Sequence, residues 1–332
     1  MTIAAEQWSF PRVYGGRGIA ILIAALLVLW ITGQRVEMGR MATLTVEAVM
    51  AQLGLAERSQ VADGLGKLMG QLVPIQLSDQ RDVTRIEGFD PDRLPLFSHL
   101  ETVATKVERL DPQSMRREQV IERATVLVRP LGYLGHVAIK MLETLEIALW
   151  GTVIAAMIGL PLGLLGARNI TPHPAVRVAA RSIIGLLRAI PELISALFLV
   201  VAYGFGPIAG VLALALYGAG FLGKFYAEDM ESADPKPQEA MTAMGAGRLL
   251  LWRFAVLPQV VPQFIAYTLY ILDRNVRMAT VIGLVGAGGI GQELKGSYDM
   301  YEYGHVGTIL VAILIVVLLL DHGAARLRHR WL

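Results

Sequence analysis

The sequence has no cysteine among its 332 residues, which excludes disulfide bonds, thiolate metal ligands and cysteine nucleophiles. Its six histidines never lie three or four residues apart, so we predict no metal site. The Walker A pattern G-x-x-x-x-G-K-[ST] is missing, so no ATP site of that kind is expected, and no cofactor is predicted. The net charge is only +2 and no long basic tract occurs, so the sequence does not support nucleic-acid binding.

Charged side chains are also scarce, at 17% of the residues, whereas a soluble domain usually carries about 25%. Uncharged runs of 21, 31 and 19 residues follow Glu146, Glu192 and Arg253. Because roughly 20 apolar residues in a helix cross a bilayer, the composition excludes a soluble enzyme. It predicts an all-α polytopic protein of the lipid bilayer with about six transmembrane helices. We place these spans at 18–34, 144–167, 182–203, 207–224, 259–285 and 303–321.

The first span follows Arg12 and Arg17 and has the basic flank and apolar core of a signal peptide. The residues around Gly33 make a poor cleavage site, so we favour an uncleaved span over a cleaved leader. Residues 35–134 differ in kind, with 13 basic and 14 acidic side chains. Apolar residues recur at helical spacing in 94–110 and 116–127, which predicts amphipathic helices in a water-facing insert.

Loops that flank the spans set the orientation, because cytoplasmic loops retain Lys and Arg. The loop 168–181 has three arginines and no acid, and the C-terminal tail has three more against Asp321. Six spans place both of these, the N-terminus and the loop 225–258 on the cytoplasmic side. The insert 35–134 then lies on the opposite side.

The loop 225–258 contains two prolines, Pro235 and Pro237, shortly before Glu239. Proline and then an acid suit the first turn of a helix. We therefore predict a short helix that ends or turns at Gly245, and a second helix over 246–257 that ends before Pro258. The exposed face of this pair either docks on a partner or packs as a cap on its own bundle.

A known family has this pattern. Glu239-Ala240-Met241, Gly245 and Ala255-Val256-Leu257-Pro258 resemble the EAA loop of binding-protein-dependent ABC importer permeases. In that family the loop forms coupling helices that dock on the ATP-binding subunit. The resemblance implies that role for Glu239, Ala240, Gly245, Leu257 and Pro258. The sequence departs from the family at Met241, usually Ala, and at Ala255, usually Ile.

The resemblance extends over roughly 130–330. Segments 256–260 and 281–292 are similar to the phosphonate-importer permeases, as are 142–152 and 188–192. It implies a type I ABC importer permease fold in a bacterial inner membrane, with a second permease copy as a homodimer. It also implies two copies of an ABC ATP-binding subunit and a periplasmic phosphonate-binding protein as partners. The domains expected are 1–17 (cytoplasmic N-terminus), 18–34 (first transmembrane helix), 35–134 (helical periplasmic insert), 135–325 (permease core) and 326–332 (cytoplasmic tail).

A glycine-rich segment comprises Gly286, Gly288, Gly289 and Gly291 and matches G-x-G-x-x-G. A dinucleotide loop requires a preceding strand and an acid about 20 residues later. Here a membrane span precedes the glycines and 306–310 has no acid, so we reject a Rossmann site. The pattern instead favours backbone that bends at membrane depth, and the family resemblance implies a periplasmic gate.

The predicted span 259–285 contains Asp273, Arg274, Asn275 and Arg277. Charge inside a membrane costs about 2.5–3.5 kcal/mol per residue on insertion scales, and such groups face the bundle interior. Asp273 and Arg277 are four residues apart and can form a structural ion pair. Arg274 has no partner nearby in the sequence, so these four residues either hold helices together or line the translocation pathway of an anion.

We therefore expect a permease, not an enzyme, that imports phosphonate or a related phosphorus oxyanion such as phosphate or phosphite. A partner hydrolyses ATP and drives alternating access between two conformations. Two alternatives remain, an ion-coupled secondary transporter and a membrane-anchored scaffold that works through the insert 35–134.

Overall fold

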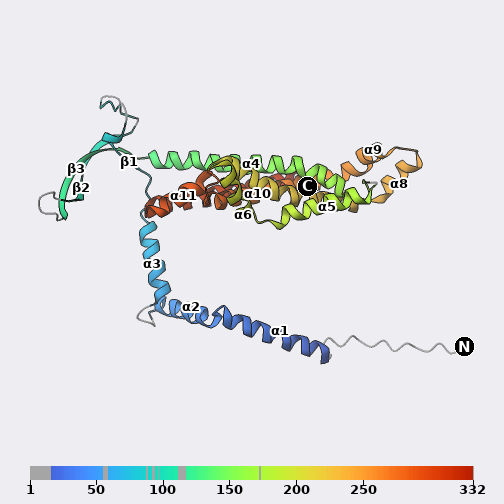
Figure 1. Ribbon diagram of the computed structural model, residues 1–332, viewed down its shortest axis with the longest axis horizontal. Coiled ribbons are helices and arrows are strands. Elements are labelled where there is room, and N and C mark those ends of the chain that lie inside the picture. Colours follow the sequence, from blue (N-terminus) through green and yellow to red (C-terminus); the bar gives the residue numbers. More distant parts are fainter. Residues whose placement is uncertain are drawn as a thin grey trace. The chain divides into compact units, whose positions relative to one another are not determined.

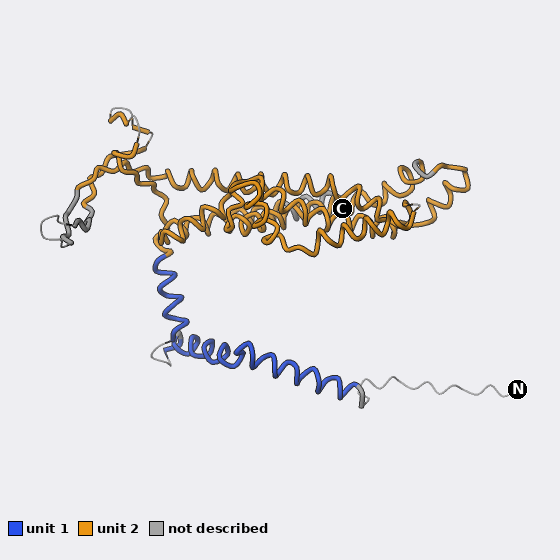
Figure 2. Tube along the Cα trace, viewed as in Figure 1, with its two compact units in different colours: residues 1–71 blue, residues 72–332 orange. Residues whose placement is uncertain are grey.

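The computed structural model describes residues 16–54, 59–86, 89–91, 94–95, 97–110, 117–171 and 173–331. Most of the predicted N-terminal segment 1–17 lies outside these residues. The chain divides into two compact units, residues 1–71 and 72–332, shown in different colours in Figure 2. Each unit is described separately below.

The first unit contains helices α1 (Gly16–Arg35) and α2 (Met38–Gln52) and nearly all of α3 (Gln60–Leu72). The first helix matches the predicted span 18–34, and its apolar side chains are exposed along its whole length. Glu37 joins α1 to α2 in the left-handed conformation, with φ of 54°. The prediction of helical structure is therefore confirmed for the first part of the insert, where α2 and α3 lie.

The prediction of helices at 94–110 and 116–127 is wrong. These residues form β2 (His99–Leu110) and β3 (Arg117–Arg129), which pair with β1 (Asp79–Asp82) in an antiparallel sheet of order β1-β3-β2. The register places His99 opposite Val128 and Leu110 opposite Arg117. Both segments are rich in Val, Thr and Ile, whose branched side chains favour strands. The pairing of β2 with β3 outweighed the helical spacing of the apolar residues within each segment.

The second unit otherwise consists of helices. They are α4 (Gly132–Gly166), α5 (Pro174–Ala189), α6 (Glu192–Tyr203), α7 (Pro207–Ser232), α8 (Pro235–Ala243), α9 (Arg248–Leu251), a π-helical turn (Trp252–Val256), α10 (Leu257–Gly283), α11 (Gly289–Asp299) and α12 (Tyr303–Trp331). In Figure 1, α8 and α9 lie at one end of this bundle and the sheet lies at the other. Helix α12 continues beyond its candidate membrane span, which ends at Gly323, into the predicted tail 326–332 as far as Trp331.

Five helices of the described residues are long and apolar enough to span a membrane, or six if one bent pair counts as a single span. This agrees with the predicted count of about six. The bent pair is α5 and α6, which meet at 87° and replace the straight span predicted at 182–203. Ile190 and Pro191 form the bend, and both have extended backbone conformations. Proline disfavours the helical region for the residue before it, which explains the break.

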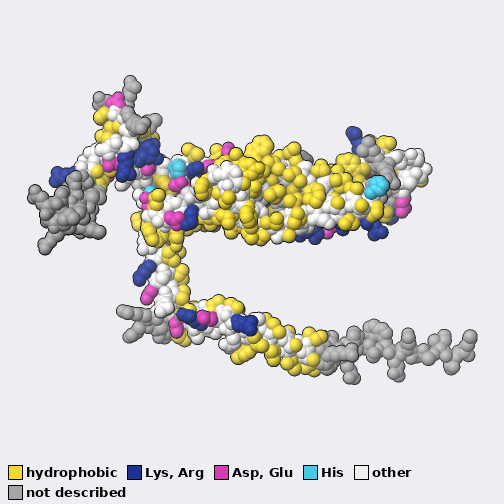
Figure 3. Space-filling model, in the orientation of Figure 1, with side chains coloured by type: hydrophobic (Ala, Val, Ile, Leu, Met, Phe, Trp, Pro, Cys, Tyr) yellow, Lys and Arg dark blue, Asp and Glu magenta, His cyan; other side chains and the backbone are white. Residues whose placement is uncertain are grey.

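The centre of the bundle is the packing of α4 against α7. Small residues recur every four positions on one face of α4, namely Gly151, Ala155, Gly159 and Gly163. A Cβ added at Gly163 would lie 2.9 Å from Cβ of Tyr226, and one at Gly151 would lie 2.9 Å from Cβ of Leu214. Such a stripe lets two helix backbones approach closely, which is how helices associate in membranes. The face of the bundle seen in Figure 3 is mostly hydrophobic.

Candidate functional site

The segment between α7 and α10 begins with an exposed helix. In α8, Glu239 and Ala240 are exposed, and the carboxylate of Asp234 caps the helix by accepting a hydrogen bond from the N–H of Lys236 at 3.0 Å. Gly245 follows the helix with φ of 77°, which confirms that the helix ends at a turn there. None of the residues of α8 is buried in this chain.

The second half of this segment differs from the prediction. The chain after Gly245 forms α9 and the π-helical turn, and then continues into α10 without stopping before Pro258. Pro258 instead occupies the first turn of α10, where its missing N–H costs no hydrogen bond. Leu257 is half-buried and Pro258 is exposed.

Side-chain hydrogen bonds connect α8 to the membrane-embedded helices. The N–H of Asp234 donates to Oε1 of Gln259 in α10 at 2.9 Å, and Nε2 of Gln259 donates to the carbonyl of Ala255 at 2.6 Å. On the other side, Nδ2 of Asn169 donates to the carbonyl of Met230, near the end of α7, at 2.6 Å. The Asp234–Gln259 bond thus joins the start of α8 to α10, and the Asn169–Met230 bond joins the loop after α4 to α7.

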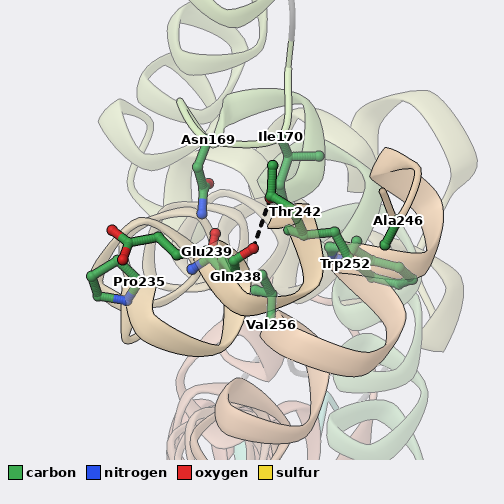
Figure 4. Close-up of a pocket in the computed structure, with 10 residues that line it drawn as sticks. Asn169, Ile170, Pro235, Gln238, Glu239, Thr242, Ala246, Trp252 and Val256 are labelled. Atoms are coloured by element: carbon green, nitrogen blue, oxygen red, sulfur yellow. Dashed lines mark hydrogen bonds between the residues drawn. The ribbon is translucent and has the colours of Figure 1, made fainter. Parts of the chain in front are cut away.

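A pocket of about 610 Å³ lies between α8, the loop after α4 and the π-helical turn. Figure 4 shows Pro235 and Glu239 on one side of it and Ala246 and Trp252 on the other. Within α8, Oγ1 of Thr242 donates to the carbonyl of Gln238 at 2.7 Å, the dashed line in Figure 4. One side of α8 therefore faces this pocket.

In the middle of the bundle, Arg274 has a partner that sequence spacing did not reveal. Its Nη1 lies 2.5 Å from Oε1 of Glu192, which stands at the start of α6, just after the α5–α6 bend. The Glu192 side chain is only 8% exposed. The guanidinium also lies over the ring of Tyr217 in α7, with Cζ 4.3 Å from the ring centre. Arg274 thus connects α6, α7 and α10.

The predicted pair of Asp273 and Arg277 is confirmed, with Nη2 of Arg277 2.7 Å from Oδ2 of Asp273. The structure adds a second acid, because Nη1 of Arg277 lies 3.1 Å from Oδ1 of Asp321 in α12. Asn275, between these groups, is fully buried, and its Nδ2 donates to Oγ1 of Thr152 in α4 at 2.9 Å. The four predicted residues therefore belong to three different contacts.

We expect Arg277→Gln to destabilise the bundle more than either Asp273→Asn or Asp321→Asn. Each acid variant leaves Arg277 with the other acid as its counter-charge, so the smaller loss of stability is expected for these two variants. Arg277→Gln leaves two neighbouring carboxylates without a cation, and like charges repel. Thermal unfolding of the purified chain in detergent measures the difference. A larger loss for Asp321→Asn than for Arg277→Gln would contradict this arrangement.

The glycine-rich segment forms a buried turn between α10 and α11. Gly286, Gly288 and Gly289 have φ of 92°, 83° and 70°. The N–H of Gly206, before α7, donates to the carbonyl of Gly286 at 3.0 Å. Gly288, Gly289 and Gly291 are also buried. These φ values agree with the predicted bent backbone. A dinucleotide-binding loop requires a preceding strand, and none precedes the glycines among the described residues of this region.

Two side chains of α4 hold the first turn of α11. A carboxylate oxygen of Glu143 accepts a hydrogen bond from the N–H of Gly289 at 3.0 Å, and Oγ1 of Thr144 accepts one from the N–H of Ile290 at 2.8 Å. Lys140 lies 2.7 Å from Glu143 and balances its charge. A negative group at the start of a helix is stabilised by the helix dipole.

No sequence pattern assigned Glu143, Thr144, Glu192 or Gln259 to a site. One signal was present for Glu192, which begins the 31-residue uncharged run. An acid inside a membrane requires a cation from another span, and Arg274 was the cation without a local partner.

The chain matches the profile of the family "Binding-protein-dependent transport system inner membrane component" over residues 159–327. It is 53% identical over 257 residues to the putative phosphite transport system permease protein HtxE of Stutzerimonas stutzeri, covering 77% of this chain and 98% of that protein. It is 43% identical over 183 residues to the phosphate-import permease protein PhnE of Mycolicibacterium smegmatis, covering 55% of this chain and 34% of that protein.

Solved structures share the fold. An inward-facing form of the MetNI methionine ABC transporter aligns with a TM-score of 0.52 and 24% identity, covering 59% of this chain and 96% of that chain. An amino acid ABC transporter aligns with a TM-score of 0.52 and 17% identity, covering 60% of this chain and 95% of that chain.

Proposed function

Because the chain belongs to the binding-protein-dependent transport system inner membrane components, we propose that it is the permease of an ATP-driven importer for phosphite, phosphonate or phosphate. The observation that carries the substrate class is the 53% identity with a putative phosphite permease over nearly its full length. A separate ATP-binding subunit hydrolyses ATP, a periplasmic phosphonate-type binding protein delivers the substrate, and two permease copies form the pathway.

The geometry around α8 supports coupling to the ATPase. Glu239, Ala240 and Gly245 present an exposed surface that a partner can hold, and the hydrogen bonds through Asp234 and Gln259 connect it to α10. When ATP closes the ATPase dimer, we infer that α8 moves, and α7 and α10 move with it. The bundle then changes between two conformations that differ in their affinity for the ATPase dimer.

The buried polar groups of α10 support a pathway for an anion. Arg274 lies at the α5–α6 bend, held by Glu192 and stacked on Tyr217, and Asn275 lies beside it. A guanidinium binds oxyanions through paired N–H groups. We assign Arg274 to the pathway. The contacts of Arg277 with Asp321 and of Asn275 with Thr152 hold α10 against α12 and α4.

We expect Arg274→Ala to destabilise the chain by about 3–5 kcal/mol, because it leaves Glu192 buried without its counter-charge. The double variant Arg274→Gln/Glu192→Gln removes both charges and is expected to regain most of that stability. If Arg274 binds the transported anion, the stable double variant still loses substrate uptake. We expect a loss of roughly tenfold or more, because one charged hydrogen bond to the anion is removed. Detergent melting curves and uptake by proteoliposomes separate the two roles. Wild-type uptake by the double variant would remove Arg274 from the pathway.

The turn at Gly286, Gly288, Gly289 and Gly291 is the proposed gate on the side opposite α8. Glu143 and Thr144 hold the start of α11 by backbone hydrogen bonds, so the gate opens only when α4 and α11 separate. The positive φ values of Gly286, Gly288 and Gly289 favour glycine at these three positions.

Reconstituted uptake tests the function as a whole. The permease is placed in proteoliposomes with its ATPase, and the binding protein is supplied loaded with phosphite, methylphosphonate or phosphate. We expect uptake that requires ATP and proceeds without an ion gradient. Uptake driven by a gradient in the absence of ATP indicates a secondary transporter instead. Failure of any ATPase to co-purify with the chain, together with no uptake, favours the scaffold alternative.

A further inference from the structure

Helix α5 carries a row of arginines on one of its faces. Arg177, Arg181 and Arg188 are separated by four and seven residues, which places them on one face of the helix. This face meets α7, where Lys224 and Glu228 form another i,i+4 pair, with Nζ 3.5 Å from Oε1. These two helices thus bring several cations together.

A pocket of about 200 Å³ lies between the two helices at this point. Its charged lining consists of Arg181, Arg188, Lys224 and Glu228. One water occupies about 30 Å³ in the liquid, so the pocket has room for a small ion together with some of its water. Gly185 also lines it, and a Cβ at that position would have no heavy atom within 4 Å.

The charges of this pocket do not cancel. Nη2 of Arg181 bonds to Glu231 at 2.7 Å and its Nε to the carbonyl of Gly166 at 3.0 Å. Lys224 pairs with Glu228. Arg188 has no carboxylate partner among the described residues, and its Nε is buried with no hydrogen-bond partner there. One positive charge therefore remains, on a group that can donate further hydrogen bonds.

Packing fixes the Arg188 side chain. A Cβ added at Gly220 of α7 would lie 2.8 Å from Cγ of Arg188, so the glycine leaves space for the arginine stem. Arg188 also precedes the bend at Ile190, and Glu192, which holds Arg274, follows it. The pocket and the Arg274 pair therefore flank the same bend.

We propose that this pocket is a binding site for a phosphorus oxyanion, with Arg188 as its principal ligand. A planar guanidinium that lacks a counter-ion is suited to two oxygens of such a group, and Arg181 and Lys224 add charge beside it. The group belongs either to a free ion or to a phospholipid headgroup, which have the same chemistry. The inference that the imported ion binds at this site rests on the proposed function.

The test uses the purified complex of the permease and its ATPase, with radiolabelled inorganic phosphate as the probe in equilibrium dialysis. Wild type is expected to bind phosphate saturably, and Arg188→Gln to bind it roughly tenfold to a hundredfold more weakly, as for loss of a charged hydrogen bond. Arg177→Gln, on the same helix face but outside the pocket, is the matched control and is expected to bind as wild type. If Arg188→Gln binds phosphate as tightly as wild type and also retains the same phospholipids, the proposed site is overturned.

Two further arms complete the test. Gly185→Leu keeps every charge but fills the pocket, so it is expected to weaken binding while its melting temperature stays near that of wild type. Native mass spectrometry tests whether the oxyanion is a phospholipid headgroup. In that case the wild-type complex retains a phospholipid that Arg188→Gln loses, and free phosphate does not bind. If neither phosphate nor a phospholipid binds at Arg188, the proposal is overturned, even if the wild-type complex imports phosphite. Binding at Arg188 by a complex that imports no phosphorus oxyanion keeps the site and removes the proposed function.

Discussion

Gly291→Ala is expected to prevent the close packing of α10 on α11 and to destabilise the chain by about 3 kcal/mol or more, the upper end for overpacking. A Cβ at this position would lie 2.0 Å from the carbonyl oxygen of Thr280 and 2.9 Å from Cα of Gly283. Both contacts are with backbone, so no side chain can rotate away. The melting temperature of the purified chain in detergent measures the loss.

Gly296→Ala is the matched control, because Gly296 lies in the same helix and a Cβ there would have no heavy atom within 4 Å. Replacing a glycine inside a helix by alanine stabilises it by up to about 1 kcal/mol. The two variants are therefore expected to shift the melting temperature in opposite directions. Equal shifts in melting temperature for the two variants would show that α11 packs less tightly on α10 than the Gly291 contacts indicate.

Gly245→Val is expected to reduce ATP-driven uptake roughly fivefold to thirtyfold, while the chain stays folded in the membrane. Gly245 has φ of 77°, a conformation that valine adopts only with strain of about 1–2 kcal/mol, which corresponds to that range of population change. The glycine is exposed and a Cβ there would have no heavy atom within 4 Å, so the cost arises from the backbone alone. The strain is relieved by moving the end of α8, which the ATPase is proposed to hold.

Gly247→Val provides the control for this experiment. Gly247 is also exposed, and a Cβ there also meets no heavy atom within 4 Å, but its φ is not positive. It is expected to retain uptake and co-purification with the ATPase. If Gly245→Val transports as well as Gly247→Val, the turn after α8 has no part in coupling.

Much of the architecture was accessible from the sequence because lipid imposes simple rules. A bilayer leaves no water for unpaired backbone groups, so long uncharged runs become helices. The approximate span positions, the short helix before Gly245 and the pair of Asp273 with Arg277 were predicted on such local grounds. The structure confirms this pair and these helices, except that the bent pair of α5 and α6 replaces the span predicted at 182–203. All of them depend on neighbours within a few residues.

The insert shows where this reasoning fails. In water, 94–110 and 116–127 had two possible structures, and the spacing of their apolar residues fitted a helix. The strands form because β2 and β3 pair along their whole length and β1 adds to β3. Pairing between distant residues is not visible in the period of one segment, although the many branched side chains were a signal.

By itself, the sequence determined that this is a helical membrane protein with an exposed loop helix, because hydrophobic run length and turn residues act locally. Only the tertiary structure decided which buried charges meet. Arg274 finds Glu192 across 82 positions of sequence, and Glu143 reaches the N–H of Gly289 from another helix. In an apolar interior each charged or polar group must find a partner. The choice among partners depends on which helix faces the packing of α4, α7 and α10 brings together.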